Sequence, residues 1–190
     1  MRIIGGKLKN KKILFHINLK TRPLKDSVRE NIFNILDHSK KISVKIKGSN
    51  ILDLYSGSGS FGLEALSRFA SKVYFVEKDF HTFENFKKNI INFKIKNEAV
   101  LYNQDVLNFF EGLDLNVKFN IVFLDPPYAD KKYGEILKLI AQREILNKNH
   151  ILIIHRERKK QEKLNFKNLN ILDERIYGRS KILFCKLSSF

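Results

Sequence analysis

The feature that most constrains the fold is an apolar run at residues 50–54 that passes through three glycines into a helical pattern at 63–68. Glycine at positions 57, 59 and 62 allows positive φ and a close backbone approach to a ligand, because no Cβ stands in the way. A strand, a tight glycine turn and a helix in this order are typical of the first unit of an α/β domain that binds an adenine-containing cofactor. The alternative is a turn that only joins the strand to the helix.

The charges around this turn bear on which cofactor it holds. The glycine spacing also fits the dinucleotide fingerprint, and Glu77 follows Gly57 by twenty residues at the end of the apolar run 72–76. However, Asp53 lies near the carboxyl end of the first strand, where it would repel a pyrophosphate and attract a cationic sulfonium with its amino group. We therefore favour S-adenosylmethionine over NAD. Glu77 suits both, since a carboxylate can accept hydrogen bonds from two ribose hydroxyls.

The remainder of the chain alternates between strand and helix patterns, which predicts an α/β fold with a core. An aromatic stripe at Phe80, Phe83, Phe86, Ile90 and Phe93 has helical spacing, and we interpret it as part of that core. The predicted elements after the first helix are strands at 72–76, 98–102, 119–124 and 150–155, a helix at about 131–143, and two closing antiparallel strands at 169–176 and 181–187.

Residues 1–48 form a predicted basic extension before a main domain at 49–190. Residues 1–47 contain thirteen Lys or Arg against three acids, a net charge of +10 out of +16 for the chain. This asymmetry predicts contact with a nucleic-acid backbone, although a lysine-rich composition can also reflect codon usage. The pattern predicts two short strands within residues 1–15, a helix capped by Asp26, and a lysine-rich linker at 40–49.

Three basic residues, Arg22, Lys25 and Arg29, lie at the polar entrance of that helix. They could form a solvated face, or they could hold phosphate and orient the substrate. Spacing alone leaves both interpretations open.

The most specific chemical signal is Asp125-Pro-Pro-Tyr128 at the end of a buried strand. The prolines fix φ and remove two backbone donors, which leaves rigid carbonyls. The Asp125 carboxylate and the Pro126 carbonyl could each accept one N–H of a planar amino group and turn the nitrogen lone pair toward an electrophilic methyl. Tyr128 would stack on the base, and Pro127 is a further predicted substrate contact. Alternatively, the prolines only end the strand.

Other chemistry-bearing residues give weaker signals. Asp105 follows a strand end, where it could accept a hydrogen bond from an adenine amino group, cap a helix, or do both. The single cysteine, Cys185, lies in an apolar run, which favours a buried thiol in a reducing cytoplasm. No apolar run is long enough to span a membrane. The five histidines (16, 38, 81, 150 and 155) show no metal-ligand spacing, and we interpret each as a packing or surface residue.

Short blocks of characteristic sequence lie along nearly the whole chain, and in order they are Arg2–Gly6, Thr21–Pro23, Asp26, Val28–Glu30, Phe33–Asn34, Leu52–Leu54, Ser56–Gly59, Gly62–Arg68, Val76–Asp79, Asp125–Tyr128 and Tyr177–Gly178. Together these blocks resemble the RsmD family of bacterial methyltransferases, which act on guanine N2 in small-subunit ribosomal RNA. The amino-terminal blocks make the match specific to this family. Two positions differ from the family pattern: Leu24 stands where threonine is usual, and Ser27 replaces a basic residue.

The resemblance implies a Rossmann-like, seven-stranded class I methyltransferase with a small RNA-contacting extension. It implies S-adenosyl-L-methionine as methyl donor and a guanine of 16S ribosomal RNA, within a largely assembled small subunit, as substrate. Matched onto this chain, the glycine turn and Asp53 would hold the methionine part, Glu77 the ribose and Asp105 the adenine. Asp125 and Tyr128 would hold the target base. The expected cofactor site comprises Asp53, Tyr55, Gly57, Gly59, Glu77, Lys78, Asp105 and Val106.

Three other functions stay open at this point. The Asp125–Tyr128 chemistry also serves adenine N6 in DNA, although 190 residues leave little room for a sequence-reading domain. A protein glutamine amide is another planar nitrogen, but it gives the basic extension no purpose. A non-catalytic ribosome-assembly factor could keep the same fold. We expect a cytoplasmic monomer with no metal and no membrane association.

Overall fold

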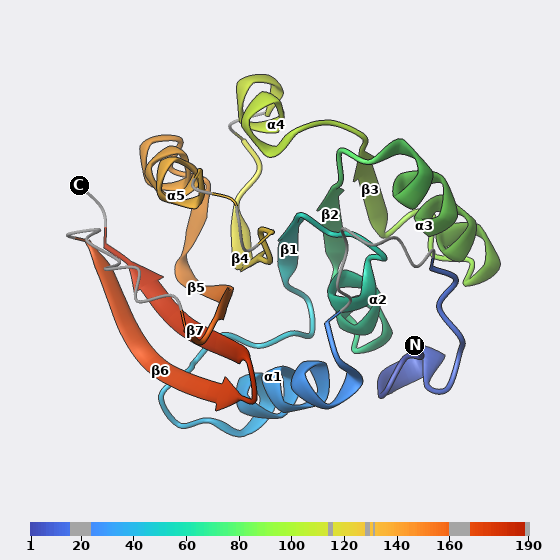
Figure 1. Ribbon diagram of the computed structural model, residues 1–190, viewed down its shortest axis with the longest axis horizontal. Coiled ribbons are helices and arrows are strands. Elements are labelled where there is room, and N and C mark those ends of the chain that lie inside the picture. The colour runs from blue at the N-terminus through green and yellow to red at the C-terminus, as the bar shows by residue number, and fades with distance from the viewer. Residues whose placement is uncertain (16–23, 114–115, 128–129, 131, 160–167, 189–190) are drawn as a thin grey trace.

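A computed structural model describes residues 1–15, 24–113, 116–127, 130, 132–159 and 168–188. Within these ranges the chain forms one seven-stranded sheet in the order β3-β2-β1-β4-β5-β7-β6, with helices on both faces (Figure 1). The α/β fold and its seven-stranded sheet are therefore confirmed. The strands are β1 (Asn50–Leu54), β2 (Lys72–Val76), β3 (Ala99–Tyr102), β4 (Phe119–Leu124), β5 (Leu146–Glu157), β6 (Leu169–Tyr177) and β7 (Ser180–Leu187).

The first five strands are parallel, and β7 and β6 complete the sheet as an antiparallel pair. Parallel strands covered on both faces are apolar on both sides, and β4 shows why. Ile121 and Phe123 point into one hydrophobic cluster, whereas Val122 and Leu124 point into a second cluster on the other face. The helices are α1 (Asp26–His38), α2 (Ser60–Ser67), α3 (Phe80–Asn92), α4 (Val106–Gly112) and α5 (Tyr133–Gln142), with a short 3-10 helix, η1 (Gly6–Leu8). No helix in the described ranges combines the length and apolar character needed to cross a membrane.

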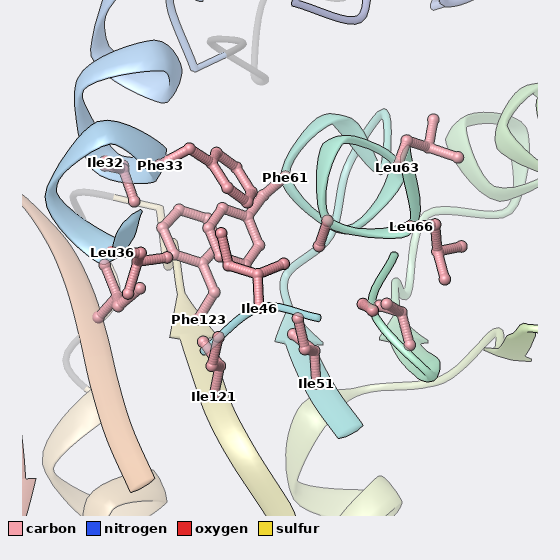
Figure 2. Close-up of a cluster of buried hydrophobic side chains, with 14 of the residues drawn as sticks. Ile32, Phe33, Leu36, Ile46, Ile51, Phe61, Leu63, Leu66, Ile121 and Phe123 are labelled. Atoms are coloured by element: carbon pink, nitrogen blue, oxygen red, sulfur yellow. The ribbon is translucent and has the colours of Figure 1, made fainter. Parts of the chain in front are cut away.

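Helix α1 packs directly on the main domain. Phe33 on α1 contacts Phe61 on α2 with ring centroids 5.1 Å apart, and Phe61 stacks on Phe123 of β4 at 4.0 Å. Figure 2 shows these three rings together, with Ile32 and Leu36 of α1 beside them. Residues before position 49 therefore share the hydrophobic core of the sheet.

The amino-terminal strands predicted from the pattern are wrong. Only an isolated antiparallel bridge joins Arg2 to Lys12, and η1 lies between them. The cause is a buried carboxylate on α2: the amides of Ile4 and Gly5 donate to Glu64 at 2.7 and 2.8 Å and so are not available for a strand ladder. The segment is thus fastened to α2.

Two smaller expectations also differ from the structure, at Asp26 and Phe80. Asp26 is the first residue of α1 and pairs with Arg29, so it does not cap the helix. The linker predicted at 40–49 does connect α1 to β1 without a helix or strand, and its alternate apolar side chains at Ile42, Val44 and Ile46 are buried. Phe80, at the start of α3, is 60% exposed and so is not part of the core, whereas Phe86, Ile90 and Phe93 are buried as predicted.

Candidate active site

A pocket of about 680 Å³ lies at the carboxyl ends of the parallel strands. Asp53 of β1, Glu77 after β2, Asp105 after β3 and Asp125 after β4 all line it. This is the edge at which open α/β sheets bind ligands, and the volume suits a small-molecule cofactor. The strand order thus brings together carboxylates that lie up to 72 residues apart in the sequence.

The glycine turn forms one wall of this pocket, and its own contacts bear on the cofactor. Gly57 donates its amide to Glu77 Oε2 at 2.8 Å, Gly59 to the Ser56 carbonyl at 2.7 Å, and Gly62 to Asp53 Oδ2 at 3.0 Å. A pyrophosphate would find these three donors already used. It would also meet a wall of carboxylates, so the geometry disfavours a dinucleotide.

The turn needs glycine for two different reasons. Gly57 has φ +53° and opens toward the pocket, where no atom would crowd a Cβ closer than 3.9 Å. Gly59 has φ +71° and does not line the pocket, and a Cβ there would lie 2.2 Å from the Phe86 ring. The structure therefore gives Gly59 a packing role against α3, and the direct cofactor contact expected of it stays a prediction.

Asp53 shows that the pocket fits a cationic group. It is 1% exposed, and its Oδ1 is a buried atom without a hydrogen-bond partner in the described part of the chain. Burial raises the pKa of Asp53 well above its ordinary value, and the neighbouring Asp125 and Glu77 carboxylates raise it further. A buried carboxylate with an unused acceptor is completed by a positive donor such as the ammonium of S-adenosylmethionine.

The other predicted cofactor residues lie around the same pocket. Glu77 accepts from the amides of Gly57 and Asp79 at 2.8 Å each, and burial raises its pKa. These bonds fix the carboxylate, while each oxygen keeps a second lone pair for a ribose hydroxyl.

The structure is compatible with both roles that the sequence suggested for Asp105, a helix cap and an acceptor for the adenine amino group. It caps α4 by accepting from the Leu107 amide at 3.1 Å, and it lines the pocket. Lys78 lies 3.8 Å from its carboxylate. Val106 also lines the pocket, as does Tyr55, whose hydroxyl donates to Asp130 Oδ2 at 2.9 Å.

The carboxylate of Asp125 has one occupied and one open oxygen. Its Oδ1 lies 2.7 Å from His155 Nδ1, whereas within the described residues its Oδ2 has no hydrogen bond. Asp125, Pro126 and Pro127 line the pocket with Asp53, so the predicted amine-binding group lies beside the predicted cofactor site.

The described residues predicted to bind RNA differ in their exposure to solvent. Arg22 and Tyr128 lie outside the described residues. Lys25 is exposed just before α1, as expected of a phosphate contact. Arg29, in contrast, is fully buried: it donates to the Arg2 carbonyl and pairs with Asp26 and Glu64. The substrate-binding role predicted for Arg29 is therefore corrected to a structural one, because a phosphate on the surface cannot reach its guanidinium.

Sequence reasoning missed His155. It lies on β5 beside the carboxyl end of β4, since Leu124 pairs with Ile154, and it lines the pocket. The signal was available: the apolar run 151–154 ends at His155, and the strand-end rule that identified Asp125 applies equally there.

Comparison with known proteins matches residues 1–186 to the family model described as Conserved hypothetical protein 95. The chain belongs to this family. Among relatives, it is 33% identical over 179 residues to the Ribosomal RNA small subunit methyltransferase D of Haemophilus influenzae, covering 94% of this chain and 89% of that protein. The resemblance to the RsmD family is thereby confirmed.

Solved structures agree on the fold of this RsmD-family chain. The Escherichia coli protein yhhF superposes with a TM-score of 0.82 at 27% identity, covering 100% of this chain and 99% of that chain. The protein SMU.776 was solved in complex with SAH; it has a TM-score of 0.65 at 17% identity, and the match covers 84% of this chain and 49% of that chain. At that identity the second likeness concerns the fold alone.

Proposed function

We propose that the protein transfers a methyl group from S-adenosylmethionine to the exocyclic N2 amino group of a guanine in 16S ribosomal RNA, within a largely assembled small subunit. Membership of the RsmD family and the names of its relatives support an rRNA methyltransferase that uses this cofactor. The site assignment rests on two carboxylates that line the same pocket. Asp53 Oδ1 is buried without a hydrogen-bond partner in the described residues and could accept from a cation, and Asp125 Oδ2 could accept from an amine.

The residues of the chain position the reactants. Asp125 Oδ2 and the Pro126 carbonyl would each accept one N–H of the guanine amino group, which directs its lone pair toward the methyl carbon. When bound, S-adenosylmethionine supplies an electrophilic methyl: the nitrogen forms the new bond, and the sulfur–methyl bond breaks with its electron pair returning to sulfur. The nitrogen, now positive, is stabilised by the Asp125 carboxylate until it releases its proton.

We propose roles for the other predicted residues as well. Asp53 would hold the cationic methionine end, Glu77 the ribose and Asp105 the adenine, with Tyr55, Lys78 and Val106 around them. Tyr128 would stack on the base, and Lys25 with Arg22 would hold phosphate. The exposed lysines of the segment 1–15 add a cationic surface for the RNA backbone. We retain the predicted monomer and the cytoplasmic location, where the buried Cys185 thiol needs no partner.

The experiment is transfer of a labelled methyl from S-adenosylmethionine to three substrates: small ribosomal subunits lacking the modification, naked 16S rRNA, and duplex DNA. The labelled nucleoside is then identified. Label in N2-methylguanosine, strongest on subunits, is expected. Label in N6-methyladenine of DNA would overturn the substrate while keeping the site chemistry. Cofactor binding without label in any substrate would favour a non-catalytic assembly factor.

A further inference from the structure

His155 is buried, and with the Asp125 carboxylate it forms a partly buried hydrogen-bonded chain that continues to β7. His155 Nδ1 lies 2.7 Å from Asp125 Oδ1, and its Nε2 lies 2.9 Å from the Ser180 hydroxyl. The imidazole is 5% exposed, and its strand is held between β4 and β7, with His155 opposite Ile182 in the ladder. The ring therefore has little freedom to turn.

The chemistry of the carboxylate fixes the direction of its bond to His155. An ionised carboxylate can only accept, so a bond at 2.7 Å requires a proton on Nδ1. In the neutral ring Nε2 then carries the lone pair, and the Ser180 hydroxyl donates to it. The chain thus runs from Ser180 through His155 to Asp125 Oδ1.

This arrangement leaves the two oxygens of Asp125 unequal. Oδ1 is held by His155 from the side of β5, while Oδ2 accepts no hydrogen bond within the described residues. A carboxylate that could rotate would present its lone pairs in many directions, whereas one held at Oδ1 keeps Oδ2 in a single orientation. Positioning of this kind matters because displacement by about 1 Å can cost about 100-fold in rate.

We propose that His155 is a positioning residue for methyl transfer, which holds Asp125 so that Oδ2 receives the substrate amino group, and that Ser180 selects the required imidazole tautomer. This inference rests on the proposed function. His155 itself does not contact the reacting atoms in this scheme, and its effect is exerted through Asp125.

Three substitutions of His155 separate positioning from folding. His155→Asn can place an amide N–H close to the position of Nδ1, whereas His155→Gln places its amide near Nε2, and His155→Phe keeps a ring without a donor. With S-adenosylmethionine and small subunits lacking the modification, we expect kcat of the Phe variant to fall about 10- to 100-fold, with KM for both substrates nearly unchanged. The Asn variant should recover most of the wild-type kcat, and the Gln variant should not. Equal losses in the Asn and Gln variants, or a change in KM alone, would overturn the proposal.

A second measurement does not depend on the RNA substrate. In the ¹⁵N NMR spectrum of the full chain, the His155 signals are identified as those that disappear in the His155→Asn variant. These signals should be those of a neutral ring protonated at Nδ1. The Ser180→Ala substitution should shift them. A ring protonated at Nε2 would refute the positioning role, even in an active enzyme. If the Nδ1 proton is found but the wild type methylates no guanine, the proposed function fails while the hydrogen-bonded chain is upheld.

Discussion

Two fully buried carboxylates on adjacent elements have opposite environments. Glu64 on α2 accepts from the Ile4 and Gly5 amides and pairs with Arg68 and Arg29 at 3.0 and 3.7 Å. Asp53 on β1 accepts only from the Gly62 amide, and its second oxygen lacks a partner in the described structure. Both side chains are at most 1% exposed, so burial alone does not distinguish them.

The difference indicates what each carboxylate is for. Removal of one partner from a buried and fully paired charge strongly destabilises a fold, and Glu64 fastens the amino-terminal segment and α1 to α2. A buried charge with an open acceptor costs folding free energy, and it gains its partner only when a ligand binds. Completeness of the hydrogen-bond set therefore separates the structural carboxylate from the one that faces the pocket.

The largest expected effect comes from a substitution that disrupts the hydrogen bonds and ion pairs of Glu64. Glu64→Gln removes one of the two counter-charges of the buried Arg29 guanidinium, the other being Asp26, and places an NH₂ group against a backbone amide. We therefore expect a loss of about 3 to 5 kcal/mol in the free energy of unfolding. Urea titration followed by circular dichroism measures it. Glu30→Gln, at an exposed position on the same core-packed α1, is the control and should change stability by less than about 0.5 kcal/mol. A Glu64 variant as stable as this control would contradict the structural role.

Asp53→Asn should have the opposite effect: it should leave stability intact and weaken cofactor binding. The Asn oxygen can still accept from Gly62, so the free energy of unfolding should hold or rise, while the loss of a charged acceptor should weaken S-adenosylmethionine binding by about 1.5 to 3 kcal/mol. Isothermal titration calorimetry gives the affinity, and urea titration gives the stability. If Asp53→Asn destabilises the protein but leaves cofactor affinity intact, Asp53 has a structural role like that of Glu64 and the proposed difference between the two carboxylates is wrong.

The same variant gives a pH test with a defined sign. Burial raises the folded-state pKa of Asp53, so the folded protein binds a proton that the unfolded chain has already released. Stability from this group is therefore present below about pH 4 and is lost as pH rises through the folded-state pKa. Relative to wild type, Asp53→Asn should gain stability as pH increases over that window. A constant difference between the two proteins from pH 4 to 8 would show that Asp53 titrates normally.

Much of this fold could be predicted because the deciding interactions are local. The run 119–124 is apolar at every position except Asn120, which is typical of a strand covered on both faces, and the structure places β4 at the predicted residues. The strand-end rule likewise placed Asp53, Glu77, Asp105 and Asp125 at one edge of the sheet, since parallel strands share their carboxyl edge.

The remaining features depend on contacts between distant residues. Arg29 looks like a surface cation in sequence, and only the fold places Glu64 beside it, 35 positions away. The amides of residues 4 and 5 likewise donate to Glu64, about 60 positions later in the sequence. These bonds hold the segment against α2 in place of the predicted strands. For His155, the strand-end rule could have placed the residue at the pocket edge, but its hydrogen bond to Asp125 crosses the β4–β5 ladder, and no spacing in the sequence marks that pair.

The smallest expected effect concerns the outer surface of the segment that Glu64 fastens. Lys9, Lys11 and Lys12 are exposed there, whereas Arg29 is buried beneath it, so the RNA-facing charge should come from the lysines. Each Lys→Gln substitution should lower affinity for the RNA substrate a few-fold and reduce the slope of log K against log salt by about 0.7 to 0.9, because one fewer counterion is released. Filter binding across a salt series measures this. Lys138→Gln on α5 is the control, since that helix covers the opposite face of the sheet in Figure 1. If the control lowers the salt slope as much as the amino-terminal variants, the charge effect is general and the fastened segment is not the RNA contact.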